Sequence, residues 1–450
     1  MNDDMTSSDS HFDFTSWQLD GRTLRLRYAL LGGTGPDCTF EEVIQMPETL
    51  PAPDLADPAV RAAIELVHFT FGVSYYKAAC PPKVSAAPVA EPLAQFLEIL
   101  YSEGLGEFYF RNDIRPAKLQ FPRLDQVAAR ASYAAPARER ALVLVGGGKD
   151  SVVAREVLRH AGVECDAISM GTAHWIETSA AAMGSAHHVI RRTIDPKLFQ
   201  LNEGGAPNGH VPISACIAAV CLLAAISGGY SAVVAANERS ADEGNTFWNG
   251  FEVNHQWSKS YRFETLFRQV AESLIPGAPL YLSALRPLSE LAIAGKFAGH
   301  RRYHAAVSSC NKNFRIHEPR GERRWCGQCP KCVFVYMMVA AHAAPDVLAN
   351  VFEGDFLADP GNLETIADLA GVGGMKPFEC VGTPIECRAA LGQLHEHGRL
   401  SPGCVAWYES SLQTDRAREV SDWSTAMTSS TAYTLPDVWQ ARLDAYLGAE

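Results

Sequence analysis

Residues 141–162 read ALVLVGGGKDSVVAREVLRHAG, and this stretch decides the fold. The run ALVLV is typical of a buried strand, and SVVAREVLRHAG has the apolar spacing of a helix. Between them lie Gly146, Gly147 and Gly148. A glycine backbone lets an anion approach closely, and the start of a helix supplies free N–H groups and a positive dipole end. The stretch therefore predicts a strand, a loop that fits a phosphate or pyrophosphate, and a helix.

Short apolar runs continue to alternate with helical segments along the chain. The runs VECDAISMG, HHVIRRTI and SAVVAA begin at residues 163, 187 and 231. Buried strands separated by helices are typical of a parallel sheet with helices on both faces. We therefore predict an α/β protein whose central domain, residues 131–345, is a doubly wound parallel sheet.

The two flanking regions have different patterns. Residues 12–45 alternate as strands do, with Asp20 and Gly21 as a hairpin signal, and helical patterns follow at residues 60–70 and 93–102. These features predict an α+β N-terminal domain, residues 1–130, with a small sheet. Strand signals fade after Pro345, so residues 346–450 are predicted to form a helical C-terminal region.

Composition excludes several classes of protein. With 450 residues, 47% hydrophobic and 20% charged, the chain has the composition of roughly two to four folded domains rather than of a disordered or fibrous protein. A net charge of −12 disfavours a nucleic-acid partner or an anionic membrane surface. The start of the chain lacks the pattern of a signal peptide, so we expect a cytoplasmic protein. The sequence does not predict the oligomeric state.

One uncharged stretch, residues 211–236, has the hydropathy of a membrane span. Pro212 lies at one end and Gly228 and Gly229 interrupt it, which leaves a helix over residues 213–226. Such a helix is too short to cross a bilayer, so we predict a buried helix followed by a strand.

The glycine loop differs from two familiar phosphate-binding motifs. Asp150 follows Lys149 where a Walker A motif has Ser or Thr, and Ser151 stands where a dinucleotide fingerprint has its third glycine. The interpretation that needs no ligand is a tight strand-to-helix turn capped by Asp150 or Ser151.

A second polar cluster follows the strand that ends near residue 236. It contains Asn237, Glu238, Arg239 and Asp242. Loops after parallel strands converge on one crevice, so this cluster is predicted to face the same nucleotide as the glycine loop. Glu238 or Asp242 could bind Mg²⁺, and Arg239 could bind phosphate or a substrate carboxylate. The alternative is a solvated loop with helix caps.

The most specific metal motif is WCGQCPKC. It carries Cys326, Cys329 and Cys332, and Cys310 lies upstream. Four thiolates can complete tetrahedral Zn²⁺ coordination with no open position, which predicts a structural metal. An iron–sulfur cluster uses the same ligands and stays possible, as do ordinary free thiols.

The glycine loop resembles the pyrophosphate loop, or PP-loop, of the ATP pyrophosphatase superfamily, S-G-G-x-D-S, with Gly146 in place of the first Ser. The resemblance implies an ATPase core that cleaves ATP between the α and β phosphates. Gly147, Gly148 and Ser151 would then cradle phosphates, Lys149 would offer charge, and Asp150 would help to hold Mg²⁺.

Over residues 70–390 the chain is similar to the ATP-dependent UDP-N-acetylmuramoyl-L-alanyl-L-glutamate epimerases of bacterial peptidoglycan synthesis. The similar segments include GVSYYKAACP, GLGEFYFRND, NERSADEGN, NHQWSKSYRFE and WCGQCPKCVF. The resemblance implies a UDP-sugar peptide substrate and inversion of its terminal glutamate through an acyl-adenylate, with release of AMP and diphosphate. The glycine loop with the cysteine cluster also resembles seven-cyano-seven-deazaguanine synthase, an enzyme about half as long.

Two other function classes stay open. One is another AMP-forming ligase or synthetase that makes an amide, nitrile or thio product. The other is a nucleotide-sensing or zinc-ribbon protein without chemistry, against which the carboxylates of Asp150, Glu238 and Asp242 argue.

The proton carriers are the least determined part of the sequence analysis. Inversion needs a titratable group within reach of the Cα proton. The catalytic candidates are His255, Lys259 and Asp150, with Tyr76, Lys77 and Cys380 as further possibilities. Candidates for a substrate surface between domains are Tyr75, Tyr76, Lys77, Glu107 and Asn112, for which packing in an aromatic core is the alternative.

Overall fold

The computed structural model describes residues 9–33, 37–124, 132–134, 136, 138–314, 323–412, 416–433, 435 and 437–447. One mixed sheet of nine strands runs through it in the order β11-β8-β5-β6-β7-β3-β2-β1-β4. Its strands are β1 (His11–Asp20), β2 (Thr23–Leu31), β3 (Cys38–Gln45), β4 (Lys83–Ser85), β5 (Arg140–Leu144), β6 (Glu164–Met170), β7 (His187–Thr193), β8 (Ala232–Ala235) and β11 (Leu280–Ser283). A separate hairpin contains β9 (Thr246–Trp248) and β10 (Phe251–Val253).

The five strands from β11 to β7 are parallel. Alternate residues of β5 enter two hydrophobic cores, one on each face of the sheet. Helices α5 (Lys149–His160) and α6 (His174–Met183) pack in one core, and α8 (Ile213–Gly228) and α9 (Tyr261–Leu274) pack in the other. The prediction of an α/β protein with a large, mostly parallel sheet between helices is confirmed.

The strand order places the two predicted polar loops side by side. β5 precedes β6 and β7 on one side of the sheet, whereas the chain returns to the other side for β8 and β11. The order therefore reverses between β5 and β8, and ligands of open parallel sheets bind where this reversal occurs. The glycine loop follows β5 and the loop of Glu238 follows β8, so both lie at this point.

The N-terminal strands extend the same sheet. β1 and β2 form the predicted antiparallel hairpin, with Gly21 at a φ of +58° in its turn, and β2 pairs with β3. β3 then pairs antiparallel with β7. The predicted small N-terminal sheet is therefore continuous with the central sheet, because the free edge of β3 finds a partner there. The domain boundary near residue 130 stays a prediction.

Helices of the first half cover the face that contains α8. They are α1 (Pro58–Phe71), α2 (Val73–Tyr76), α3 (Glu91–Ser102), α4 (Gly106–Asn112) and α7 (Pro196–Glu203). The predicted helix over residues 213–226 is confirmed as the buried α8, and a strand follows it. Among the described residues, no helix has both the length and the apolar character needed to span a membrane.

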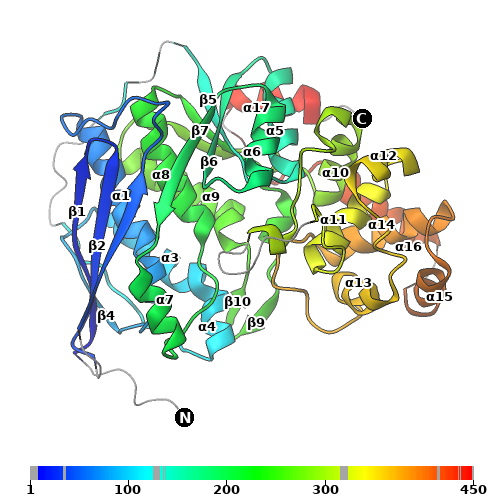
Figure 1. Ribbon diagram of the computed structural model, residues 1–450, viewed down its shortest axis with the longest axis horizontal. Coiled ribbons are helices and arrows are strands. Elements are labelled where there is room, and N and C mark those ends of the chain that lie inside the picture. The colour runs from blue at the N-terminus through cyan, green and yellow to red at the C-terminus, as the bar shows by residue number, and fades with distance from the viewer. Residues whose placement is uncertain are drawn as a thin grey trace.

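Residues after Pro345 are helical, and the part of them that the structure describes contains no strand. Figure 1 shows most of these helices at one end of the molecule and strands β1 and β2 at the other, while α17 returns to lie near α5. The helices after α9 are α10 (Glu290–Gly299), α11 (Pro330–Ala340), α12 (Pro345–Val351), α13 (Leu363–Leu369), α14 (Pro384–Glu396), α15 (Pro402–Ser411), α16 (Arg416–Met427) and α17 (Asp437–Leu447).

Candidate functional site

The glycine loop has the backbone that the sequence predicts. Gly147 has a φ of +87°, and a Cβ there would lie 3.1 Å from the backbone of Trp175. The N–H of Ser308 donates to the carbonyl of Gly147 at 2.9 Å. Gly148 is the N-cap of α5, and Gly146 is exposed. Ser308 and the backbone of Trp175 thus support the loop on one side, while Gly146 is exposed and none of the described side chains caps the start of α5.

Lys149 is directed into the protein rather than toward solvent. Its side chain is 1% exposed and its ammonium pairs with Asp150 and with Glu290, the first residue of α10. Lys331 pairs with the other oxygen of Glu290 at 3.3 Å. The charge of Lys149 is therefore shared with these two carboxylates, which fixes the start of α5 against α10.

The loop after β8 adds a third carboxylate to this group. Glu238 is 3% exposed. Burial and the negative charge of Glu290 raise the pKa of Glu238 to about 8, although Lys259 partly opposes them. The negative charge of Asp150 acts in the same direction. Three carboxyl groups, of Asp150, Glu238 and Glu290, therefore lie together beside the glycine loop among the lysines that pair with them, and their oxygens are ligands that a divalent cation prefers.

A second polar group surrounds the thiol of Cys380. The Lys259 ammonium donates to Cys380 Sγ at 3.1 Å, and His255 also hydrogen-bonds to this thiol. His255 Nδ1 lies 2.5 Å from a carboxylate oxygen of Glu107. The same oxygen lies 3.7 Å from Nδ1 of His210.

The charges in this second group depend on one another. Burial raises the pKa of Cys380, but the charge of Lys259 and the hydrogen bond from His255 outweigh burial and lower this pKa to about 5. Burial lowers the pKa of His255, but hydrogen bonds to Cys380 and Glu107 outweigh it and raise this pKa to about 9. Near neutral pH the pair is therefore a thiolate beside an imidazolium.

Glu107, His210 and His255 have ligand atoms within 4.8 Å of one another, which is close enough to share a metal ion. The positive charges of Lys259 and Arg111 act on His210 in the same place. These charges disfavour a cation, so proton transfer is the better use of the three side chains.

The two groups meet at Lys331. This residue pairs with Glu290 on the glycine-loop side, and its ammonium also donates to the backbone carbonyl of Cys380. The charge of Lys259 likewise acts on both Glu238 and Cys380. A glycine-loop half and a thiol–imidazole half are therefore joined by Lys331 and Lys259 into one polar site.

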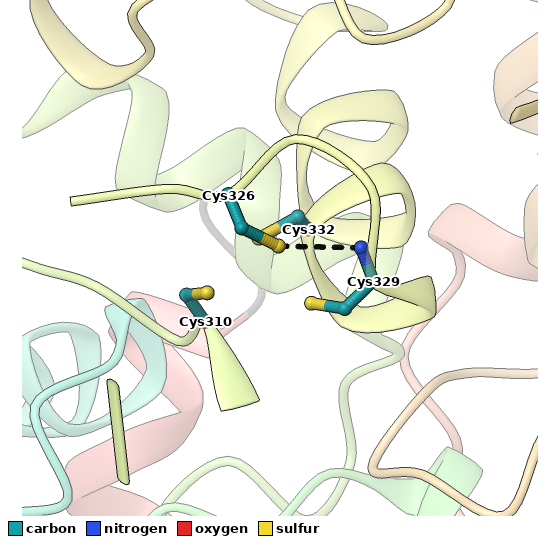
Figure 2. A group of neighbouring side chains, drawn as sticks. All are labelled: Cys310, Cys326, Cys329 and Cys332. Atoms are coloured by element: carbon teal, nitrogen blue, oxygen red, sulfur yellow. Dashed lines mark hydrogen bonds between the residues drawn. The ribbon is translucent and has the colours of Figure 1, made fainter. Parts of the chain in front are cut away.

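The four predicted cysteine ligands come together. The sulfurs of Cys310, Cys326, Cys329 and Cys332 lie within 4.8 Å of one another, and Figure 2 shows them converging on one centre. Cys326 Sγ accepts the backbone N–H of Cys329 at 3.3 Å. A four-thiolate group fits a structural Zn²⁺ or an iron–sulfur cluster.

The cysteine cluster adjoins the site on two sides. Ser308, which holds Gly147, lies two residues before Cys310. Lys331 lies between Cys329 and Cys332 at the start of α11. A bound metal would therefore fix both a support of the glycine loop and the lysine that joins the two halves of the site.

The hydrogen bonds of Arg239 are made away from the glycine loop. Its guanidinium donates to the carbonyls of Thr425 at 2.8 Å and of Ala426 at 2.9 Å, at the end of α16. It also donates to the carbonyls of Pro287 and Thr428. Because the C-terminus of a helix carries partial negative charge, Arg239 acts there as a cap.

Asn237 and Asp242 also make local contacts. Asp242 accepts the N–H of Tyr261 at 2.6 Å at the start of α9, and the hydroxyl of Tyr433 hydrogen-bonds to it. The side chain of Asn237 hydrogen-bonds to Tyr281. Among the predicted residues of the loop after β8, Glu238 is the one on which the charges of Glu290 and Asp150 act.

Tyr75 and Tyr76 lie in the hydrophobic core. Both are 0% exposed. The ring of Tyr75 stacks on Tyr28 with centroids 5.1 Å apart, and the hydroxyl of Tyr76 donates to the carbonyl of Pro81. The structure thus offers no substrate surface at either ring, and aromatic packing accounts for both.

Lys77 and Asn112 support a loop rather than the cluster itself. Lys77 Nζ donates to Asn208 Oδ1 at 2.6 Å, and Asn112 Nδ2 donates to the Asn208 carbonyl at 3.1 Å. Asn208 lies two residues before His210, so these contacts position the loop that carries His210. Glu107 is the member of the predicted substrate set that reaches the thiol–imidazole half.

Sequence analysis missed Glu290, His210 and the contacts that Lys331 makes with Glu290 and with the Cys380 carbonyl. Glu290 follows Ser289, whose side chain caps α10, so the pair has the pattern of an ordinary helix start. Lys331 contacts Glu290 and Cys380, which lie 41 and 49 positions away, so no local pattern predicts these contacts.

Fold and site together define an α/β protein with one polar site at the reversal point of a parallel sheet. The family model described as MurL N-terminal domain matches residues 4–284, and the one described as MurL C-terminal domain matches residues 306–425. The chain belongs to the MurL family.

Curated relatives agree with this assignment, and each is named UDP-N-acetyl-alpha-D-muramoyl-L-alanyl-L-glutamate epimerase. The relative from Xanthomonas oryzae pv. oryzae is 43% identical over 75% of this chain and 75% of its own. The relative from a Micromonospora species is 40% identical over 86% of this chain and 87% of its own. The relative from Salinispora tropica is 39% identical over 93% and 91%, respectively. These names support an epimerase.

Proposed function

We propose that this protein inverts the terminal L-glutamate of UDP-N-acetylmuramoyl-L-alanyl-L-glutamate through an acyl-adenylate formed from ATP, with release of AMP and diphosphate. The reaction would take place in the cytoplasm as a step of peptidoglycan synthesis. The observation that carries the proposal is the continuity of the site, in which Lys331 and Lys259 join an anion-binding loop to a thiol–imidazole pair.

The chemistry explains why an epimerase would contain both halves. Removing the Cα proton beside a free carboxylate would create two adjacent negative charges. Adenylation neutralises the carboxylate, so the developing enolate no longer adds to an existing charge. An epimerase of this kind therefore needs a phosphate site for activation and a proton carrier next to it.

The phosphate half would hold the triphosphate of ATP in a PP-loop. Gly146 to Gly148 and the start of α5 offer backbone N–H groups and the positive end of a helix dipole. The carboxylates of Asp150 and Glu238 offer the oxygen ligands that Mg²⁺ prefers, and the charge of Asp150 acts on Glu238. Bound there, Mg²⁺ would neutralise phosphate charge during transfer of AMP.

The thiol–imidazole half would move the proton. His255 is held by Glu107 on one side and by Cys380 on the other, so the direction of its ring is fixed. Lys259 lies at the same thiol. Both groups carry protons near neutral pH, which suits them to return a proton to Cα.

The proposal is tested by ATP–pyrophosphate exchange in the presence of the nucleotide dipeptide. We expect exchange with the substrate that ends in L-glutamate and with an analogue that ends in L-glutamine, because both keep the α-carboxylate that is attached to Cα. We expect no exchange with an analogue whose α-carboxylate is blocked as its amide, because the group to be adenylated is then missing. The Asp150→Asn variant should lose exchange with either substrate. Absence of exchange from the metal-loaded wild-type protein would refute the proposal.

A further inference from the structure

Cys380 is held by more contacts than a structural thiol needs. Its sulfur accepts from Lys259 at 3.1 Å and from His255, and its carbonyl accepts from Lys331. The residues on either side are also fixed. Glu379 accepts the N–H of Lys331 at 2.9 Å, and the Val381 carbonyl accepts from Gln256 at 3.0 Å. The residue as a whole is partly exposed.

The surroundings of this thiol favour a nucleophile over a base. Two cationic donors stabilise its thiolate, and a thiolate stabilised in this way binds a proton weakly. Its nucleophilicity falls much less than its basicity, because the dependence on pKa is shallow. Removing a proton from carbon requires a base of matched strength, which the resting Cys380 thiolate is not.

We propose that Cys380 attacks the acyl-adenylate and carries the glutamyl group as a thioester during inversion. This inference rests on the proposed function, since the acyl-adenylate is its starting point. Lys331 contacts both the Cys380 carbonyl and Glu290, the residue that also pairs with Lys149 of the glycine loop. Cys380 therefore lies next to the place where the adenylate would form.

The steps balance without a further reagent. The thiolate forms a bond to the acyl carbon while the bond from this carbon to the AMP oxygen breaks, and AMP leaves as the phosphate anion. A base removes the Cα proton of the thioester and the opposite face is reprotonated. Water then adds to the thioester carbonyl, which releases the carboxylate and returns the thiol.

Acylation would also create the base that the reaction needs. The negative charge of the thiolate is one of the causes that raise the pKa of both His255 and Lys259. A thioester is neutral, so its formation removes that support and lowers both pKa values. His255 or Lys259 therefore becomes able to accept a proton after the substrate is attached, and not before.

The experiment compares wild type, Cys380→Ser and His255→Asn after acid quenching with ATP and the nucleotide dipeptide. Wild type or His255→Asn should show a covalent adduct, equal in mass to the substrate minus water, on the peptide that contains Cys380. Hydroxylamine should release it. In His255→Asn the adduct should accumulate, because acylation precedes the step that needs the base.

The Cys380→Ser variant should keep ATP–pyrophosphate exchange within a few-fold of wild type, lose the adduct and slow inversion by roughly 10³-fold or more. Cys38→Ser is the matched control, because Cys38 is a partly exposed thiol of β3 outside the site, and it should behave as wild type. No adduct in either wild type or His255→Asn would overturn the inference, as would Cys380→Ser inverting at the wild-type rate. Loss of exchange in wild type itself would instead refute the proposed function.

Discussion

The buried ion pair of Arg286 and Glu264 supports the backbone of the site, and we predict how much stability is lost when this pair is removed. Both side chains are 0% exposed, and the guanidinium contacts Glu264 at 2.8 and 3.1 Å. It also donates to the carbonyl of Glu238 at 2.9 Å and to that of Lys259 at 2.8 Å. Arg286 thus fixes the backbone of one residue from each half of the site.

Breaking the pair leaves a charge in the core without its nearer partner, since Arg268 lies 3.4 Å from the other oxygen of Glu264. We expect Glu264→Gln or Arg286→Met to destabilise the protein by about 3 to 5 kcal/mol, the usual cost of an unpaired buried charge. The double variant Glu264→Leu/Arg286→Met removes both charges. Its cost should fall about 2 kcal/mol below the sum for Glu264→Leu and Arg286→Met.

Urea unfolding followed by circular dichroism measures these differences, and AMP formation measures the effect on the site. The double variant should fold but form AMP slowly, because the Glu238 and Lys259 carbonyls have lost their donor. Single variants within about 1 kcal/mol of wild type, or strictly additive effects, would refute the role given to this pair.

Four further predictions follow from the same contacts. Arg239→Ala should destabilise the C-terminal helices by about 1 kcal/mol, read by hydrogen exchange in α16, and leave the KM for ATP unchanged; a raised KM would restore a phosphate role. Removing metal with a chelator, or Cys326→Ser, should lower the affinity for ATP in equilibrium binding, because the cysteine cluster adjoins Ser308 and Lys331; unchanged affinity after metal loss would contradict this coupling. The pKa of Glu238 is raised from 4.5 to about 8, so the protonated side chain contributes stability that is fully present below pH 4.5 and lost as the pH rises through 8. In Mg²⁺-free buffer the Glu238→Gln variant should therefore become more stable than wild type above pH 8, and curves of unfolding free energy against pH that stay parallel for the two proteins would count against this. The pKa of Cys380 is lowered from 9.0 to about 5, so alkylation of this thiol by iodoacetamide should stay fast down to about pH 6 and fall below pH 5; a midpoint near 9 would exclude a thiolate.

The parts of the molecule that sequence analysis predicted are those decided by neighbouring residues. The β5–glycine loop–α5 unit and the hairpin at Gly21 each lie within one short stretch, and three of the four cysteine ligands lie within seven residues. Local backbone preference is enough to determine such features.

The parts that were missed depend on contacts between distant segments. Strand β3 joins β7 at residues about 150 positions apart, as the pair of Val43 and Thr193 shows. Cys380 meets His255 because the segment between α13 and α14 lies against the segment before α9, as the hydrogen bond from Gln256 to the Val381 carbonyl shows. Arg239 caps the end of α16 instead of contacting the glycine loop. The position of α16 beside Arg239 cannot be inferred from the sequence of either segment.

The most direct test of the central claim is to follow AMP and glutamate configuration together in D₂O. The protein would be incubated with ATP, Mg²⁺ and UDP-N-acetylmuramoyl-L-alanyl-L-glutamate, with Asp150→Asn as the control. The account predicts AMP, diphosphate and a D-glutamyl product with deuterium at Cα, all absent in the control. Inversion that proceeds equally well without ATP, or AMP release without deuterium at Cα, would contradict it.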